Sequence, residues 1–564
     1  MFFFAVFFDY IKLSKNWGGY MKLRKIIPVM LIFVSGTIVF AQELQVAPLN
    51  PEFIKFQEAK KEGTWESKTA DGHTLGYIPP PVTYKLSDKI DEPTRKLPTV
   101  FDLRTLNMVT PVKNQATCGA CWTFATYGNI ESRRLFTGEG TWDLSENNLK
   151  QYHGFVWGPC EGGNAAMSTA YLTRGSGAIL EADDPYTDYE IDNWNLNPPV
   201  MYIYDAVYLQ RNTDVIKQAC YDFGAIYTNM YYNDTYHNST NNTYYYNGSE
   251  GTNHAVTIVG WDDTKVTAGG TGAWIIKNSW GTSWGESGYF YISYNDTQVN
   301  KEVGYWPSII DYNPSREIMY YDKLGFCGYV GYGTKTAYAL VKFTSATNHT
   351  ITKLGSFLIE DGATIGYQVY DTYSGGVLSN LLGSISNQVI TKRSYVSLDL
   401  PTPINVTAGN DIYVKVYYAN PITNNPIPLE MAVGGYAVPT IETGKFWISS
   451  NGSSWSQVGG GTANLWDPCV KTYGAPIELG IPQNVATSVA GSVLTVSWSA
   501  VSGATSYVVY SADTPYGTYG IDATGTLNGT QWTTATTNTK KFYYVVATNS
   551  KTHVYNELKV SQKE

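Results

Sequence analysis

Residues 109–125 read VTPVKNQATCGACWTFA, and the interpretation of the whole chain starts from this stretch. Cys121 falls where a loop gives way to Cys121–Phe136, a segment without proline that has helically spaced apolar residues and stops before Gly138. A thiol at the N-terminus of a helix faces the positive end of the helix dipole and free N–H groups, which lower its pKa. The stretch therefore predicts a nucleophilic cysteine, with a buried or disulfide-bonded cysteine as the alternative.

A cysteine nucleophile needs an imidazole that holds the thiolate as an ion pair and later protonates the leaving group. The chain has six histidines: His73, His153, His237, His254, His349 and His553. Their positions along the chain leave His153 and His254 as candidates. His254 opens the apolar run NHAVTIVGW, and a strand is rigid enough to hold a catalytic ring. A lone histidine at such a place is more often structural, so the position alone does not decide its role.

The run Gln115-x-x-Cys118-Gly119-Ala120-Cys121-Trp122 resembles the nucleophile signature of the papain-like cysteine proteases. His254 follows Cys121 by 133 residues, within the family's spacing, and Asn278 follows it by 157, slightly beyond. Asn278 lies in WIIKNSWGTSWGESGYFYI, which is similar to the family's asparagine block.

Three further blocks stand in the family's order: Phe101–Arg104, the LSENNL of residues 144–149, and Cys160-Glu161-Gly162-Gly163. The resemblance covers roughly residues 97–295. It implies an α+β papain-like catalytic domain, with a helical subdomain and a β-barrel-like subdomain. It also implies hydrolysis of peptide bonds through a thioester.

The resemblance gives each matching residue a role. Cys121 attacks the scissile carbonyl, and His254 acts first as general acid and then as base. Asn278 orients the imidazole, and Trp280 shields that hydrogen bond from water. Gln115 donates its side-chain N–H to the oxyanion, beside the backbone N–H of Cys121.

The same resemblance places the substrate along Gly162 and Gly163, with Asn253 and Ala255 flanking the histidine. Glycine permits the close approach of an extended substrate backbone. A plain tight turn is the alternative for the two glycines. Because no His-His pair suggests an occluding loop, the sequence favours an endopeptidase over a carboxydipeptidase.

Six cysteines allow fifteen full pairings, and the residues alone do not choose among them. The resemblance pairs Cys118 with Cys160. A second family disulfide lacks both of its positions here, so we expect Cys220 to be a free, buried thiol. Cys327 and Cys469 stand near the two ends of a β-rich region, and this placement predicts a second pair.

The remaining sequence predicts several domains, because 564 residues are too many for one core. After the protease region come two stretches with alternating polarity and turn residues, which predict two all-β sandwich domains. The first resembles a lectin-like domain, and the second a fibronectin type III module. Trp447, Trp455 and Trp466 in the first are interpreted as core residues, with a sugar platform as the alternative.

The N-terminal part contains a targeting signal. A basic run from Met21, an apolar run to Phe40 and the small residue Ala41 predict a cleaved signal peptide, and Met21 as the true start. The predicted organisation is an extension 1–20, a signal peptide 21–41, a prosegment 42–96, a peptidase domain 97–307, a lectin-like sandwich 317–475 and a fibronectin type III-like domain 476–552.

Composition excludes some functions. A net charge of −9 without a basic patch argues against nucleic-acid binding. No later stretch is apolar enough to span a bilayer, and no metal-ligand cluster or cofactor motif stands out. The expected partners are protein or peptide substrates, with cell-surface glycan or protein contacts through the β-domains. A catalytically silent adhesin on a protease scaffold is the main alternative, followed by an acyltransferase. We expect a secreted or extracellular protein, with association with the cell surface as an open alternative.

Overall fold

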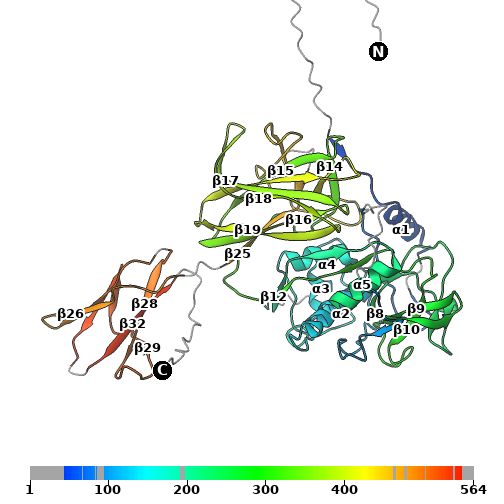
Figure 1. Ribbon diagram of the computed structural model, residues 1–564, viewed down its shortest axis with the longest axis horizontal. Coiled ribbons are helices and arrows are strands. Elements are labelled where there is room, and N and C mark those ends of the chain that lie inside the picture. The colour runs from blue at the N-terminus through cyan, green and yellow to red at the C-terminus, as the bar shows by residue number, and fades with distance from the viewer. Residues whose placement is uncertain are drawn as a thin grey trace, which may run out of the picture. The chain divides into compact units, whose positions relative to one another are not determined.

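The computed structural model describes residues 44–65, 68–82, 84, 95–190, 197–460, 465–475, 479–501, 503–537 and 540–548. The expected extension 1–20 and signal peptide 21–41 lie outside these residues. An α+β domain comes first in the chain and all-β domains follow it, as the sequence predicts (Figure 1). No helix in the described ranges is both long and apolar enough to cross a membrane.

The helices of the protease region gather beside one end of its sheet (Figure 1). They are α2 (Cys121–Phe136), α3 (Glu146–Tyr152), α4 (Ala165–Thr173) and α5 (Thr213–Phe223). Side-chain oxygens of Ser145, Asn164 and Asn212 cap α3, α4 and α5 by accepting backbone N–H groups. Helix α2 has no such cap at Ala120, so the N–H groups at its start are not satisfied by a capping side chain.

The strands of this region form the second half of the domain. They are β2 (Val100–Asp102), β3 (Met201–Ile203), β4 (Ala206–Tyr208), β5 (Ile226–Met230), β6 (His237–Asn238), β7 (Thr243–Tyr244), β8 (His254–Thr267), β9 (Gly270–Lys277), β10 (Tyr289–Ser293), β11 (Val303–Tyr305) and β12 (Ile309–Asp311). A 3₁₀ turn, η1 (Asp234–Tyr236), precedes β6. Strand β8 is the centre: it pairs with β5 and β9, and α2 packs across it. Gly128 of α2 permits this contact, because a Cβ there would lie 2.8 Å from the Thr257 hydroxyl.

The lectin-like region is a β-sandwich. Its strands are β13 (Ile318–Met319), β14 (Gly328–Gly331), β15 (Thr336–Thr344), β16 (His349–Leu358), β17 (Ala363–Ser374), β18 (Val377–Ile390), β19 (Ser394–Val406), β20 (Asp411–Ala419), β21 (Ile427–Met431), β22 (Phe446–Ser449), β23 (Ser456–Val458), β24 (Trp466–Pro468) and β25 (Val470–Ala475). One six-stranded sheet runs β18-β17-β20-β15-β22-β23. Trp466 is buried as expected, whereas Trp447 and Trp455 are only half-buried.

One sheet continues from the protease region into the sandwich. Strand β4 pairs with β11 on one side and with β19 on the other, with Val207 opposite Ser394 and Ala206 opposite Tyr395. The resulting thirteen-stranded sheet joins β13-β25-β16-β19 of the sandwich to the strands of the protease. Backbone hydrogen bonds therefore connect the two regions directly.

The last described region is a small all-β unit of two sheets. Its strands are β26 (Ala486–Ala490), β27 (Val493–Ser497), β28 (Ser506–Ala512), β29 (Gly520–Ile521), β30 (Thr526–Asn528), β31 (Gln531–Ala535) and β32 (Phe542–Thr548). The sheets run β26-β27-β31-β30 and β29-β28-β32, and Val496, Trp498 and Trp532 are in the core between them. Two facing sheets are what the fibronectin type III-like prediction requires.

The N-terminal segment, which we define as residues 44–84, extends the sandwich at one end and enters the protease at the other. Strand β1 (Gln45–Val46) pairs antiparallel with β14. Helix α1 (Pro51–Glu62) follows. Phe53 and Phe56 are its buried residues, and Phe53 meets the ring of Tyr436 edge-on at 5.5 Å.

The predicted pair of Cys327 and Cys469 is wrong, because both thiols are free and buried. The register explains why. The residue after Cys327 pairs with Leu429 of β21, and the residue before Cys469 pairs with Leu429 from the other side. Strands on opposite sides of a third are about 9.5 Å apart, whereas a disulfide needs Cα atoms within about 7 Å.

Candidate active site

The thiol of Cys121 lies where helix α2 meets the start of strand β8. Cys121 is the first residue of α2 and is fully buried. The backbone N–H of Ala255, the second residue of β8, donates to the Cys121 Sγ at 3.5 Å. The predicted nucleophile and the strand that carries the predicted imidazole are therefore in contact.

The His254 ring is held by the asparagine that follows strand β9. The Nε2 of His254 lies 2.8 Å from the Oδ1 of Asn278, which is an acceptor, so Nε2 carries the proton in this pair. Trp280 stacks on the imidazole with ring centroids 4.6 Å apart and planes at 24°. Nδ1 is buried without a hydrogen-bond partner among the described residues, so it remains available to the thiol.

Gln115 is fixed from both sides of its amide. Its Oε1 accepts a hydrogen bond from the Ser279 hydroxyl at 2.7 Å, and its backbone N–H donates to the Ser279 carbonyl at 2.8 Å. The NH₂ group therefore points the other way, where it donates to the carbonyls of Thr74 and Cys118 at 2.8 and 2.9 Å. The donor expected for an oxyanion is thus bound to a backbone carbonyl of the N-terminal segment.

The N-terminal segment fills the groove beside Cys121. Gly163 donates its N–H to the Gly76 carbonyl at 2.9 Å and accepts the N–H of Ile78 at 3.0 Å, a parallel pairing. On the opposite wall, the Asn253 carbonyl accepts the N–H of Tyr77 at 3.0 Å. Every residue from Leu75 to Val82 is buried. The predicted substrate-binding positions Gly163 and Asn253 therefore bind extended backbone in this structure.

Three glycines make the groove tight enough for this contact. A Cβ on Gly163 would lie 2.5 Å from the Trp122 ring, and one on Gly162 would lie 2.5 Å from the Gly76 carbonyl oxygen. Gly162 also has a φ of +128°, which favours glycine. A Cβ on Gly76 would lie only 1.9 Å from the Gly119 carbonyl oxygen. Both the wall and the segment in the groove thus require glycine.

Two aromatic side chains beyond the predicted set pack against Trp280, which covers the His254 ring. His73 of the N-terminal segment stacks on Trp280, with centroids 5.0 Å apart and planes at 5°. Tyr232 meets Trp280 edge-on at 4.7 Å. In the loop 231–251, the Asp234 carboxylate accepts the Ala70 N–H at 2.7 Å. This Tyr/Asn-rich loop therefore contacts both the histidine's aromatic cover and the N-terminal segment.

Burial sets the protonation of the thiol and the imidazole. It raises the pKa of Cys121 to about 11, although the N–H groups of Ala255 and Gly76 lower it in part. Burial also lowers the pKa of His254 to about 4, against the opposing effect of Asn278. At neutral pH the pair is therefore thiol and neutral imidazole while the segment covers it. The reactive ion pair requires solvent or substrate in place of the segment.

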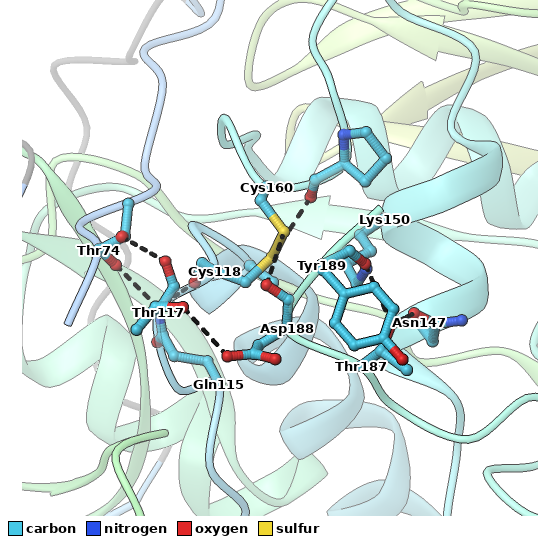
Figure 2. Close-up of a disulfide and its surroundings, with 12 residues drawn as sticks. Thr74, Gln115, Thr117, Cys118, Asn147, Lys150, Cys160, Thr187, Asp188 and Tyr189 are labelled. Atoms are coloured by element: carbon cyan, nitrogen blue, oxygen red, sulfur yellow. Dashed lines mark hydrogen bonds between the residues drawn. A yellow bond between two sulfur atoms is a disulfide. The ribbon is translucent and has the colours of Figure 1, made fainter. Parts of the chain in front are cut away.

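The disulfide joins the loop before α2 to the loop that carries Gly162 and Gly163, and its pairing is the one that the resemblance implied. Cys118 and Cys160 are bonded across a sequence separation of 42 residues. Figure 2 shows it beside Gln115, with Thr74 donating its hydroxyl to the Thr117 carbonyl at 2.5 Å. Thr117 in turn donates to the Asp188 carboxylate at 3.1 Å. Cys220 is free and buried, as expected, and burial raises the pKa of its thiol above the usual range.

A buried carboxyl group, missed by the sequence interpretation, lies next to the groove. Glu302 is only 8% exposed, and its Oε2 accepts the N–H of Ala165 at 3.5 Å, at the start of α4. Burial raises its pKa to about 7, which Ala165 and the Tyr77 hydroxyl lower in part. The charged and titratable side chains around it are Tyr77, Tyr84, Tyr208, Tyr227, Tyr436 and Arg393. No sequence motif points to Glu302, whereas Ser279 could have been found from its position next to Asn278.

Comparison with known proteins agrees with this geometry. Residues 97–306 match the family described as papain family cysteine protease. This region is a papain-family cysteine protease domain. Residues 318–474 match the family described as lectin like domain, so the protease domain is followed by a lectin-like domain. The fibronectin type III-like domain at 476–552 stays a prediction.

Curated relatives of the protease domain include viral cathepsins. That of Choristoneura fumiferana nuclear polyhedrosis virus is 34% identical over 212 residues, covering 36% of this chain and 62% of the relative. That of Epiphyas postvittana nucleopolyhedrovirus is 33% identical over 215 residues, with the same coverage. The chain thus spans about 62% of the length of these relatives.

Solved structures extend the likeness across both domains. The cysteine protease and lectin-like domains of Cwp84, a surface layer associated protein of Clostridium difficile, superimpose with a TM-score of 0.66, at 20% identity. The match covers 77% of this chain and 98% of that one. A clostridial Cwp84 structure after propeptide cleavage gives a TM-score of 0.60 at 21% identity, covering 67% and 99% of the two chains. This likeness shows a shared fold.

Proposed function

We propose that this protein is a secreted cysteine endopeptidase, made as a latent precursor whose prosegment includes the N-terminal segment. The observation that carries the proposal is the meeting of Cys121, His254, Asn278 and Gln115 at one groove that already binds extended backbone. The viral cathepsin relatives and the protease-family match support a peptidase.

Under this proposal each group carries out one step. Once the ion pair forms, the Cys121 thiolate attacks the scissile carbonyl carbon, and the oxyanion accepts hydrogen bonds from Gln115 Nε2 and the Cys121 backbone N–H. The tetrahedral intermediate collapses to a thioester while the His254 imidazolium protonates the departing amine. His254 then takes a proton from water, which attacks the thioester and releases the acid and the thiol.

Latency follows from what the segment presents to the thiol. The backbone N–H of Gly76 faces Cys121 and lowers its pKa, so the nucleophile meets a hydrogen-bond donor rather than a carbonyl carbon. The Thr74 carbonyl meanwhile occupies the Gln115 donor. The segment thus fills the groove and occupies the donor that the oxyanion would need.

Secretion and the β-domains belong to the same proposal. The resemblance of the N-terminus to a signal peptide and the disulfide favour export into an oxidising compartment. Cwp84, the protein of similar fold, is associated with a surface layer. We assign protein or peptide substrates to the groove, and surface contacts with glycans or proteins to the lectin-like domain.

The proposal is tested by active-site labelling of protein from which residues 1–96 have been removed. A peptidyl epoxide should label Cys121 stoichiometrically and abolish cleavage of a casein substrate. Cys121→Ser provides the matched control and should show neither labelling nor cleavage. A processed, reduced protein that is not labelled and cleaves nothing would be an adhesin, and incorporation of an amine in place of cleavage would make it an acyltransferase.

A further inference from the structure

A cavity of about 480 Å³ lies between the protease domain and the lectin-like domain. Its lining includes Thr137 directly after α2, Ser308 directly before β12, and Lys353 of β16. Cys121 is the first residue of α2, so the sixteen residues of this helix, about 24 Å in length, separate the cavity from the thiol. The volume lies within the range of about 300–1,000 Å³ that small-molecule sites have. The cavity is therefore large enough for a ligand and distinct from the catalytic groove.

Two arginines on the wall of this cavity have buried donors without an acceptor. The Nε atoms of Arg133 and Arg316 are buried, and neither has a hydrogen-bond partner among the described residues. Through Nη1, Arg316 donates to the Tyr204 hydroxyl at 3.1 Å and Arg133 donates to the Asp222 carbonyl at 3.5 Å. Within the described part of the chain, neither guanidinium forms an ion pair with a carboxylate. The cavity therefore favours a ligand with acceptor oxygens and a negative charge.

Carboxylates line the same cavity. The Asp205 carboxylate accepts the Ser308 hydroxyl and the Ser397 N–H, and Glu139 pairs with Arg134 at 2.5 Å. Each carboxylate keeps further lone pairs for a donor. A phosphate ion would neutralise the arginines, but its remaining oxygens would face these carboxylates and be repelled. A ligand with one carboxylate and several hydroxyl groups suits both halves of the lining, because each hydroxyl can donate to a carboxylate.

We propose that this cavity binds a sugar acid, which is a sugar that carries one carboxylate beside several hydroxyl groups. The ligand carboxylate accepts N–H groups of Arg133 and Arg316, and the ligand hydroxyls donate to Asp205 and Glu139. The C–H groups of the sugar ring contact the apolar part of the lining, which includes Ile309. This inference goes beyond the proposed peptidase and does not depend on it.

The ligand contacts both domains at once, because α2 belongs to the protease domain and β16 to the lectin-like domain. A bound sugar acid therefore stabilises the contact between them, by the free energy of its own binding to the folded chain. Its carboxylate comes either from a free sugar acid or from a uronate residue of a glycan. Thr137 and Glu139 are exposed at the edge of the cavity.

Calorimetric titration of the full chain tests the proposal, with Cys121→Ser to prevent self-digestion. The probes are glucuronate, glucuronamide, glucose and inorganic phosphate, so the carboxylate is compared with a neutral amide of the same shape, and the sugar with a bare anion. We expect glucuronate to bind about 10-fold or more tightly than each of the other three. Methyl glucuronide, which mimics a residue within a glycan, distinguishes the sources: tighter binding than glucuronate supports a glycan, and weaker binding supports the free acid.

Arg316→Gln removes one guanidinium and should bring the affinities for glucuronate and glucuronamide close to each other. Lys335→Gln, at an exposed position of the lectin-like domain, is the matched control and should leave their ratio unchanged. Thr137→Phe fills the exposed edge of the cavity without removing a charge, and it should abolish glucuronate binding even if Arg316→Gln lowers the thermal midpoint.

Three results would overturn the inference. The first is the absence of glucuronate binding at millimolar concentrations. The second is an affinity for glucuronamide or phosphate equal to that for glucuronate. The third is glucuronate binding that persists in both Arg316→Gln and Thr137→Phe. Each of them leaves the proposed peptidase standing, because epoxide labelling of Cys121 is measured separately.

Discussion

Replacing Gly76 by alanine should open the groove of the intact precursor. The new Cβ would lie 1.9 Å from the Gly119 carbonyl oxygen, 2.3 Å from its carbon and 2.6 Å from its Cα. All three atoms belong to the backbone, so no side chain can rotate away. Because real Cβ contacts are not shorter than 3.0 Å, the N-terminal segment must lift by about 1 Å.

The magnitude follows from the hydrogen bonds that this shift breaks. They are the two between Gly163 and the segment, at 2.9 and 3.0 Å, and the one from Tyr77 to Asn253, at 3.0 Å. At about 0.5–1.5 kcal/mol net for each bond, the covered state loses about 1.5–4.5 kcal/mol. That corresponds to a roughly 10- to 2,000-fold increase in the open population.

The assay is the rate at which iodoacetamide alkylates Cys121 in the intact precursor, followed by peptide mapping. Cys220, Cys327 and Cys469 are buried and free, so they should stay unlabelled as long as the protein is folded. Gly434→Ala is the matched control, because a Cβ there meets nothing within 4 Å. A labelling rate for Gly76→Ala within twofold of the wild type would refute the reasoning.

Three other predictions concern the same site. Burial raises the pKa of Glu302 from 4.5 to about 7, so the covered state keeps a proton that the open state loses. The covered state is thus fully stabilised below pH 4.5, and it loses up to about 3 kcal/mol relative to the open state as the pH rises through 7. The rate of Cys121 alkylation in the wild type, divided by the rate in Glu302→Gln, should therefore rise over this window. Ser279→Ala removes the hydrogen bond that holds the Gln115 amide, so the amide can rotate. We expect steady-state kinetics to show kcat about 10-fold lower with little change in KM. Equal losses in both constants would contradict a positioning role. Replacing Cys118 and Cys160 by serine opens a loop of 42 residues and should lower the free energy of unfolding by about 3–4 kcal/mol in urea denaturation, and an unchanged midpoint would argue against it.

Local patterns in the sequence predicted much of the fold and the site. The helix expected at Cys121–Phe136 has these bounds in the structure, because its start follows an abrupt loop and its end precedes glycine. The apolar run that His254 opens, which was expected to be a strand, lies within β8. Short-range periodicity and a motif spaced along the chain are sufficient for such predictions.

Features that depend on register or on long-range packing were not predictable in this way. The distance between Cys327 and Cys469 is set by a third strand between theirs, which no local pattern reveals. The position of residues 68–82 in the groove depends on glycines on two separate segments. Glu302 becomes important only because the fold brings Tyr77 and Ala165 to it.

The pairing of β1 with β14 gives the N-terminal segment a second point of attachment, far along the chain from the groove. Gln45 pairs with Gly331, and Gln57 donates to the Gly434 carbonyl at 2.5 Å, both on the lectin-like domain. The segment is thus a bivalent ligand of its own protein: when one contact dissociates, the other keeps it at a high effective concentration. A single cut between segment and protease would therefore not release it at once, and the lectin-like domain contributes avidity to inhibition.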